Sequence, residues 1–282
     1  MHPVHLIQGV VFAAWAVSTP STARAAEVGS RPYGTLELAV RYNPAGAAIL
    51  AEAGATHVFE QDAVHHVPAR SLSVGARANV NPADAAAGVI VRVRPFVFAE
   101  VALAYDRYGY FGANGALLSF PTAESDFGDD ARSDRSGEAV SAGGDRFTAG
   151  LTLNAISGDF YARNETRFER FHFGGGGPWF YEWEHDTLLE ATDWVAYEKA
   201  FASVAAWKGA ERQLLLLGPT FDATHSFGRT STRYRIGGAA YLALEPGDWT
   251  GQPHFLLEIG SPVRDQNRKG EIYLMALGGS SW

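Results

Sequence analysis

The sequence predicts an all-β fold, an antiparallel up-and-down transmembrane β-barrel of about twelve strands. Apolar and polar residues alternate from residue 33 to the end of the chain, as in strands with two different faces. The joints between these segments are mostly short at one end, whereas the other end holds two long insertions. The polar face is rich in Gly, Ser, Asn and Arg, whereas the outer face of a soluble sandwich would normally carry Lys, Glu and Thr.

The composition indicates a single folded unit. Of 282 residues, 46% are hydrophobic and 19% are charged, which excludes a disordered chain. The chain has no Cys, so disulfides, thiolate metal sites and cysteine nucleophiles are excluded. The formal net charge of −8 argues against nucleic-acid binding through a basic surface. No linker divides the chain, and we expect residues 26–282 to form one barrel domain.

The N-terminal segment, residues 1–25, is predicted to be a secretory signal peptide. A short apolar core is followed by a polar run and then Ala23-Arg24-Ala25, where the Ala-x-Ala pattern places cleavage after Ala25. His2 and His5 stand where Lys or Arg is usual. No Cys follows the cleavage site, so a lipoprotein anchor is excluded. We therefore expect a chain exported into the periplasm.

Strict alternation is clearest in three segments, 71–80, 146–155 and 232–244. In the first, Leu72, Val74 and Val80 share one face and Ser73 and Arg77 the other. The predicted strands cover about 33–43, 47–59, 69–80, 88–95, 97–110, 145–156, 159–173, 194–207, 212–227, 230–244, 253–264 and 270–282. The segment 47–59 is rich in Ala and weakly patterned, and the even strand count depends on its spanning the membrane.

Aromatic residues gather toward the ends of the predicted strands, where a barrel carries its interfacial girdles. The predicted girdle residues are Tyr33, Tyr42, Tyr105, Tyr108, Tyr110, Phe111, Phe171, Phe173, Trp194, Trp207 and Trp282. With the signal segment, the alternation and the unequal joints, these features resemble a Gram-negative outer-membrane β-barrel protein. The resemblance covers nearly all of the mature chain but matches no characterised subfamily.

The resemblance implies a place in the outer membrane, surrounded by its lipid, and recognition of the terminal aromatic Trp282 by the barrel-assembly machinery. Ser280 and Gly278, two and four positions before Trp282, stand where such proteins commonly have large apolar residues. This departure leaves the register of the last strand open.

The polar face of the strands would line the lumen, and its charges come in opposed sets on neighbouring strands. Such sets could form a crowded, charge-paired interior with at most a narrow water path. Alternatively, the arginines could line an open pore that favours anions. The predicted network comprises Arg92, Arg94, Glu100 and Asp106, the run Arg163, Glu165, Arg167 and Glu169, and Arg233 and Arg235 between Asp222 and Glu258.

The two long loops, about 112–144 and 174–193, are the expected places for specificity. The first is acidic, and its carboxylates could bind a divalent cation or remain solvated, but it lacks calcium-loop spacing. The second follows four glycines with Trp179, Phe180, Tyr181 and Trp183. These rings are too apolar to stay fully exposed, and they could fold back over the mouth, touch lipid headgroups, or contact a ligand or partner.

Enzyme motifs are weak in this sequence. His225 alternates with Ser226 and Asp222 along a strand and so faces away from both, and His185 has no Ser at a telling spacing. We expect no catalytic residue, metal or cofactor. The first functional hypothesis is a channel or small-solute transporter. The alternatives are a sealed barrel that binds a cell-envelope protein or surface polymer through its loops, and a lipid hydrolase acting through His185 or His225.

Overall fold

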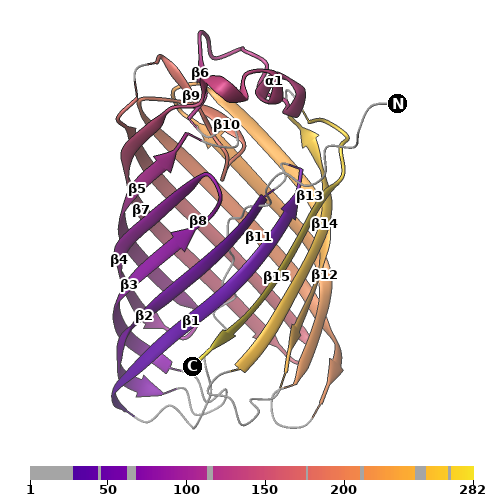
Figure 1. Ribbon diagram of the computed structural model, residues 1–282. Helices are drawn as coiled ribbons and strands as arrows, with labels where there is room; N and C mark the ends of the chain where they lie inside the picture. The colour runs from indigo at the N-terminus through magenta and orange to yellow at the C-terminus, as the bar shows by residue number, and fades with distance from the viewer. Residues whose placement is uncertain are drawn as a thin grey trace.

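The alternating segments form one continuous antiparallel sheet that closes on itself (Figure 1). The computed structural model describes residues 28–43, 46–61, 68–112, 117–175, 177–209, 213–244, 252–265 and 268–282. The barrel strands are β1 (Gly29–Tyr42), β2 (Gly46–Gln61), β3 (Pro68–Val80), β4 (Asp84–Phe96), β5 (Ala99–Phe111), β7 (Ser141–Ser157), β8 (Phe160–Phe173), β11 (Thr192–Lys208), β12 (Leu214–Ser226), β13 (Ser231–Ala243), β14 (Gln252–Arg264) and β15 (Tyr273–Ser281). The twelve strands pair in sequence order, and β15 closes the ring against β1. The predicted twelve-stranded barrel is confirmed.

The weakly patterned segment 47–59 is a full barrel strand. It lies within β2, which pairs with β1 from Gly46 to Val58 and with β3 from Ile49 to Gln61. The even strand count therefore holds. The predicted signal peptide, residues 1–25, lies outside the described residues.

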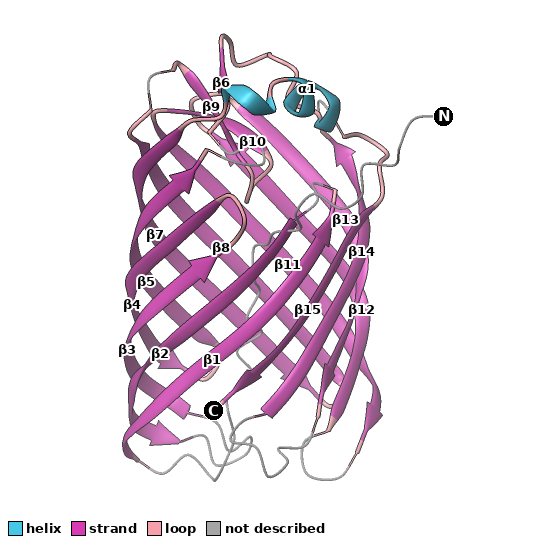
Figure 2. Cartoon of the chain, viewed as in Figure 1, coloured by secondary structure: helices cyan, strands magenta, loops and turns pink. Residues whose placement is uncertain are grey.

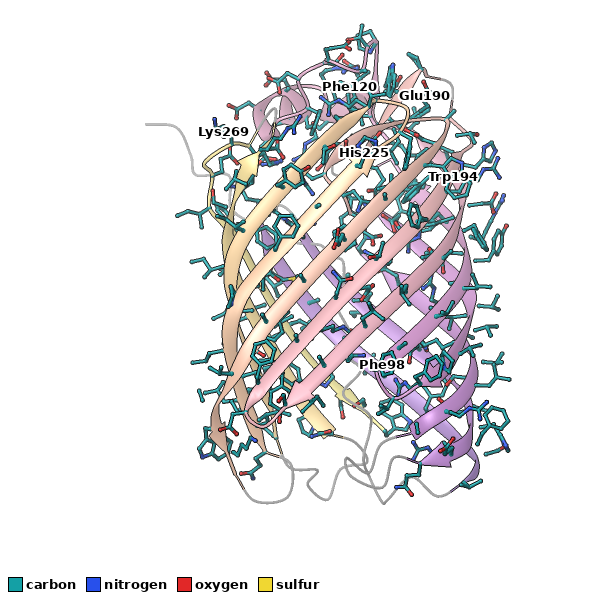
Figure 3. All side chains as sticks on the ribbon, turned by 180° about the vertical axis from the view of Figure 1, so that it is seen from behind. Phe98, Phe120, Glu190, Trp194, His225 and Lys269 are labelled. Carbon is teal, nitrogen blue, oxygen red and sulfur yellow. The ribbon has the colours of Figure 1, made fainter. Side chains whose placement is uncertain are left out.

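The outer face of the barrel is apolar. Side chains such as Leu38, Val74 and Ile236 are more than half exposed, because alternation turns them away from the lumen. Trp194 and Phe98, labelled in Figure 3, lie on this face near opposite ends of the barrel. A continuous apolar surface of this extent is what a membrane-embedded barrel presents to lipid.

The predicted girdle is correct only in part. Tyr42, Tyr105, Phe111, Trp194, Trp207 and Trp282 are exposed, whereas Tyr108, Tyr110, Phe171 and Phe173 are buried. These four belong to the inward set of their strands, since Tyr108 and Tyr110 share the parity of the lumen residue Asp106. Tyr33 is not a girdle residue either, because its hydroxyl donates a 2.7 Å hydrogen bond to the lumen residue Glu52.

The last strand has a definite register. The backbones of Trp282 and Gly34 exchange hydrogen bonds of 2.9 and 3.0 Å, which extend the seam between β15 and β1. The Trp282 ring covers Gly34, where an added Cβ would lie 2.5 Å from the indole. Phe255 on β14 lies close to Gly278 in the same way. The rings of Trp282 and Phe255 thus fill the space that larger side chains at Gly34 and Gly278 would occupy.

The two long loops contain a second, smaller sheet that the sequence did not predict. It consists of β6 (Ser119–Phe120), β9 (Trp179–Glu182) and β10 (Thr187–Glu190), in the order β10-β9-β6. A short helix, α1 (Asp129–Asp134), and a 3₁₀ turn (Ser136–Glu138) complete the first loop. No helix among the described residues is long and apolar enough to cross a membrane.

The small sheet and α1 lie together at one end of the barrel, opposite the C terminus (Figure 2). We call this end the mouth, the opposite end the lower end, and residues 117–138 and 177–191 the plug. Because β6 pairs with β9, the two loops form one folded body. Its contacts with the wall define the candidate site.

Candidate functional site in the barrel lumen

Wall charges pair with one another in the lower half of the lumen. Arg92 on β4 forms a bidentate ion pair with Glu52 on β2, with Nη2 2.6 Å from Oε2. Its Nε lies 3.7 Å from Glu100 on β5, and Glu100 accepts a 2.6 Å bond from Arg94. Tyr33 donates to Glu52 from β1. Strand parity turns each of these side chains into the lumen, where partners on neighbouring strands and on strands one further apart can meet.

A second chain of charges runs along β8. Arg163 lies 3.3 Å from Glu165, whose other oxygen lies 3.4 Å from Arg167 Nε, and Arg167 Nη1 lies 3.0 Å from Glu169. All four side chains point inward, since they occupy alternate positions of one strand. We call these two chains of charges the ladder.

A polar cavity of about 200 Å³ lies between these charges. Its charged lining includes Glu52, Arg77, Arg92, Glu100, Arg163, Glu165 and Arg167. The lower lumen is therefore lined by charges of both signs and is not completely filled by side chains.

Some predicted network residues have partners that the sequence did not indicate. Asp106 pairs with Arg77 at 2.6 Å and with Arg146 at 3.3 Å. Arg92 and Arg94 bind Glu100 instead. The unpredicted partners Glu52, Arg77 and Arg146 all occupy inward positions, so strand parity marked them as lumen residues. Which inward charges meet depends on the barrel's curvature and stagger.

On the β11–β14 side of the wall, some charge pairs are again those predicted and others are not. Arg235 Nε donates to both oxygens of Asp222, at 2.8 and 2.9 Å, across the register pair that joins β12 and β13. Glu258 is bound by Lys199, a partner that the sequence analysis missed. Arg233 contacts neither Asp222 nor Glu258 but pairs with the plug residue Asp186 at 3.0 Å.

The turn between β9 and β10 is held to the wall through its backbone and one indole. Arg41 on β1 donates hydrogen bonds to the carbonyl oxygens of Trp183, at 2.7 Å, and Glu184, at 3.2 Å. The Trp183 ring nitrogen donates to Asp84 on β4 at 2.7 Å. These contacts place the turn inside the barrel, between strands on different sides.

Side-chain contacts of the next three residues of the turn complete the attachment. Glu184 pairs with Arg146 on β7. His185 Nε2 lies 2.6 Å from Glu169 on β8. Asp186 binds Arg233 on β13. We call the turn residues 183–186 the plug tip, whose side chains and backbone together contact strands β1, β4, β7, β8 and β13.

Arg268, in the loop before β15, fixes the plug from above. Its Nε lies 2.6 Å from Asp186, its Nη2 donates to Asp129 of α1 at 2.7 Å, and its Nη1 donates to Asn43 at 2.9 Å. The two adjacent cations, Arg268 and Arg233, lower the pKa of Asp186 despite its burial. One arginine thus joins both plug loops to two other loops at the mouth.

A buried carboxylate shapes the plug tip from within. Glu182 accepts backbone N–H bonds from Glu184, at 2.9 Å, and from His185, at 2.7 Å. Burial raises the pKa of Glu182 to about 7, and the nearby carboxylate of Glu184 adds to the increase. The pKa of Glu184 itself is lowered, chiefly by Arg146.

Apolar packing holds the remainder of the plug. The aromatic run of the second loop folds back into the barrel, where Phe180 and Tyr181 are 0% and 1% exposed. The plug side chains buried with them are Leu117, Leu118, Phe120, Phe127, Trp183, Leu188 and Leu189. Trp179 is partly buried against the same cluster. The four aromatics named from the sequence therefore contact the barrel interior in this structure.

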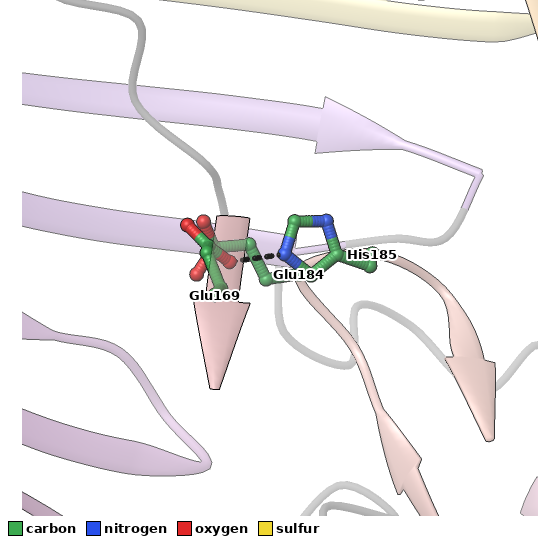
Figure 4. A group of neighbouring side chains, drawn as sticks. All are labelled: Glu169, Glu184 and His185. Carbon is green, nitrogen blue, oxygen red and sulfur yellow. Dashed lines mark hydrogen bonds and ion pairs between the residues drawn. The ribbon is translucent and has the colours of Figure 1, made fainter. Parts of the chain in front are cut away.

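One wall side chain and two plug side chains are arranged like the ligands of a metal site, but arginines already bind their carboxylates. Glu169, Glu184 and His185 place one ligand atom each within 4.8 Å of one another (Figure 4). Arg146 and Arg167 lie against both carboxylates. A divalent cation would have to displace these two guanidinium groups, so the arrangement fits an ion-pair cluster better than a metal centre.

The histidines proposed for hydrolysis contact no serine among the described residues. His225 Nδ1 lies 2.8 Å from Thr232 Oγ1, and His185 is bound to Glu169. Ser226 donates to Asp193 at 3.3 Å. A serine nucleophile and its base must lie within hydrogen-bond reach, and neither histidine has such a serine among the described residues.

No family model matches the chain, and no curated protein matches it. Among solved structures it is similar to the β domain of the Bordetella autotransporter BrkA, with 12% identity, a TM-score of 0.48, and coverage of 90% of this chain and 99% of that chain. It is also similar to the KdgM porin in complex with disordered oligogalacturonate, with 7% identity, a TM-score of 0.39, and coverage of 89% and 98%. A third is the translocator domain of the autotransporter NalP from Neisseria meningitidis, with 11% identity, a TM-score of 0.37, and coverage of 91% and 88%. The closed sheet and its apolar outer face are the features of a transmembrane barrel.

Proposed function

We propose that the protein is a channel for small solutes in the outer membrane of a Gram-negative bacterium, and that the plug holds it closed. The observation that carries the proposal is the attachment of the plug tip to the wall through ion pairs, above a polar cavity in the same lumen. When the plug tip leaves the lumen, both members of each pair regain water, which offsets part of the interaction that is lost, so such an attachment suits a gate.

Opening would change the charge of the upper lumen. Glu184 and Asp186 neutralise Arg146 and Arg233 while the plug is in place. When the plug tip leaves, these wall arginines remain and the two carboxylates depart. The opened pore is therefore expected to favour anions, chiefly through Arg146 and Arg233, because Arg92, Arg94 and Arg235 keep their wall carboxylates.

The membrane setting belongs to the same proposal. The long loops would face the outside, and the short joints and the C terminus the periplasm, as is usual for bacterial barrels. Export would depend on the signal peptide of residues 1–25, and assembly on recognition of Trp282 by the barrel-assembly machinery. Membrane lipid would cover the apolar outer face.

The experiment is a planar-bilayer recording on residues 26–282, refolded in detergent, beside a variant in which residues 178–190 are replaced by a short Gly/Ser linker. We expect the intact barrel to be mostly silent and the variant to conduct steadily with anion preference. A variant that folds yet stays silent would contradict the channel proposal.

A sealed barrel that binds a cell-envelope protein or surface polymer is the second candidate. It is favoured by one observation, the near-complete burial of the plug's apolar side chains, which resembles a permanent core. Silence of both proteins in the recording would support it. The acidic helix α1, at the rim of the mouth, would then be the first surface to test for partner capture.

A further inference from the structure

A second cavity, of about 440 Å³, lies at the mouth. Its walls come from the plug tip, the turn between β12 and β13, the end of β14 and the loop before β15. This volume lies within the range of pockets that take small molecules, about 300–1,000 Å³. This cavity shares no lining residue with the lower lumen cavity. We call it the mouth cavity.

The lining of the mouth cavity is cationic although the whole chain carries −8. Four cationic side chains line it, Arg229, Arg233, Arg264 and Lys269, with two carboxylates, Asp186 and Asp265. Asp186 is already bound by Arg268 and by the hydroxyl of Tyr181. Arg264 lies over the Tyr234 ring, 5.8 Å from its centre, and neither Arg264 nor Lys269 is paired with an acid among the described residues. These two side chains therefore give the cavity its uncompensated cationic charge.

Hydroxyl groups supply the second kind of contact. Thr224, Thr230, Ser231 and Thr232 all line the cavity. Thr224 is 3% exposed, and its Oγ1 has no hydrogen-bond partner in the structure. Arg233 Nε is also buried without a hydrogen bond, and it lies 3.7 Å from a carboxylate oxygen of Asp265. Buried polar atoms are nearly always satisfied in folded proteins, so these two atoms are available to hydrogen-bond a ligand in the cavity.

We propose that the mouth cavity binds a small hydroxylated anion, a phosphate ester or carboxylate of sugar size. Arg264 and Lys269 bind the anionic group, which also accepts a hydrogen bond from Arg233 Nε. Thr224 and the neighbouring hydroxyls contact the ligand's own hydroxyl groups. Binding at this cavity does not depend on whether the barrel conducts.

Calorimetry on the refolded full-length mature chain in detergent tests the proposal, with glucose 6-phosphate as the anionic probe and glucose as the neutral one. We expect saturable binding of glucose 6-phosphate and none of glucose. Replacing both Arg264→Gln and Lys269→Gln should weaken binding by about tenfold or more, and Thr224→Val by a smaller factor. Retained heat-modifiable gel mobility shows that each variant is folded.

The matched control is Arg107→Gln. Arg107 is an exposed arginine on β5, paired with Asp145 at 2.7 Å, and it lies outside the cavity lining. Its removal should leave affinity unchanged. Absence of saturable binding of glucose 6-phosphate, or equal affinity in the Arg264/Lys269 variant, would overturn the proposal.

A lipid headgroup carries the same phosphate chemistry as a soluble ester. Lipopolysaccharide is therefore added as a competitor and, separately, as the only phosphate source. Binding of glucose 6-phosphate in lipid-free detergent supports a soluble ligand. Binding of lipopolysaccharide alone, lost in the Arg264/Lys269 variant, would replace the proposal with a headgroup site.

Discussion

The two halves of the lumen share one strand pattern but use their charges differently. In the lower half, Arg92 on β4 and Glu52 on β2 both belong to the wall and meet across the intervening strand β3. In the upper half, Arg146 and Arg233 reach across the lumen to carboxylates of the plug tip. Wall pairs last as long as the barrel is folded, whereas plug pairs last only while two loops stay in place. Under the proposed gate, the same residue types would serve a permanent lining and a displaceable one.

The largest effect is expected from removing the plug's carboxylates. The double change Glu184→Gln and Asp186→Asn leaves Arg146 and Arg233 buried without their plug partners, and losing one member of a buried pair costs about 3–5 kcal/mol. We expect open probability to rise on the order of a hundredfold in single-channel recordings. Asn suits position 186, where φ is +51°.

Glu190→Gln is the control for this change, because Glu190 lies on the same hairpin but is exposed. It should leave open probability near that of the unaltered protein. Equal activation by the control would show that loss of any plug acid loosens the loop, which would break the contrast between the two halves.

A matching change in the lower half should affect stability but not closure. Glu52→Gln leaves Arg92 without its bidentate partner, although Glu100 stays nearby. We expect the free energy of unfolding to fall by about 1–3 kcal/mol, measured by urea titration in micelles. Glu60→Gln, at an exposed pair whose charges are 4.0 Å apart, should cost about 0–1 kcal/mol. Channel opening by Glu52→Gln alone would contradict the assignment of the gate to the upper half.

The pH dependence of closure should follow Glu182. Its pKa is about 7 with the plug in place, against an ordinary value of 4.5, so the closed state holds a proton that a released plug would lose. This contribution to closure is fully present below pH 4.5 and is lost as the pH rises through 7. Open probability should therefore increase from pH 5 to pH 8. Glu184 and Asp186, whose pKa values are lowered, stay ionised over that range.

Glu182→Gln provides the check, since an amide cannot titrate. It should flatten the pH profile of open probability between pH 5 and pH 8. A profile that keeps its slope in this variant would remove Glu182 as the cause.

The smallest effect is expected on the outer face. Trp282→Ala removes the ring that covers Gly34, and we expect unfolding free energy to fall by about 1 kcal/mol with no change in open probability. Urea unfolding and single-channel recording of the same preparation measure both quantities. Altered gating in Trp282→Ala would mean that the seam between β1 and β15 participates in opening.

The wall could be predicted from sequence because alternation is a local property. Parity alone assigns Glu165 to the lumen and Leu151 to the outer face, and it also places Tyr108 inside, where the girdle interpretation failed. The Asp222–Arg235 pair follows from simple neighbour pairing of strands. Such contacts require only strand order and register.

The plug could not be predicted in the same way. Ser119 and Phe180 pair although they lie in different loops, and no short-range pattern shows that β6 would meet β9. The attachment of Asp186 to Arg268 joins loops that are distant in sequence. The aromatic run 179–183 did signal burial, but the surface that buries it depends on the closed barrel.

The most direct test of a displaceable plug uses the absence of native Cys. Leu188→Cys places one thiol at a plug position that is 0% exposed, and its reaction with a membrane-impermeant maleimide is followed alongside conductance. We predict slow labelling in the closed barrel and much faster labelling when Glu184→Gln and Asp186→Asn are added. Labelling that stays slow while the barrel conducts would contradict the account, because ions would then pass without the plug leaving the lumen.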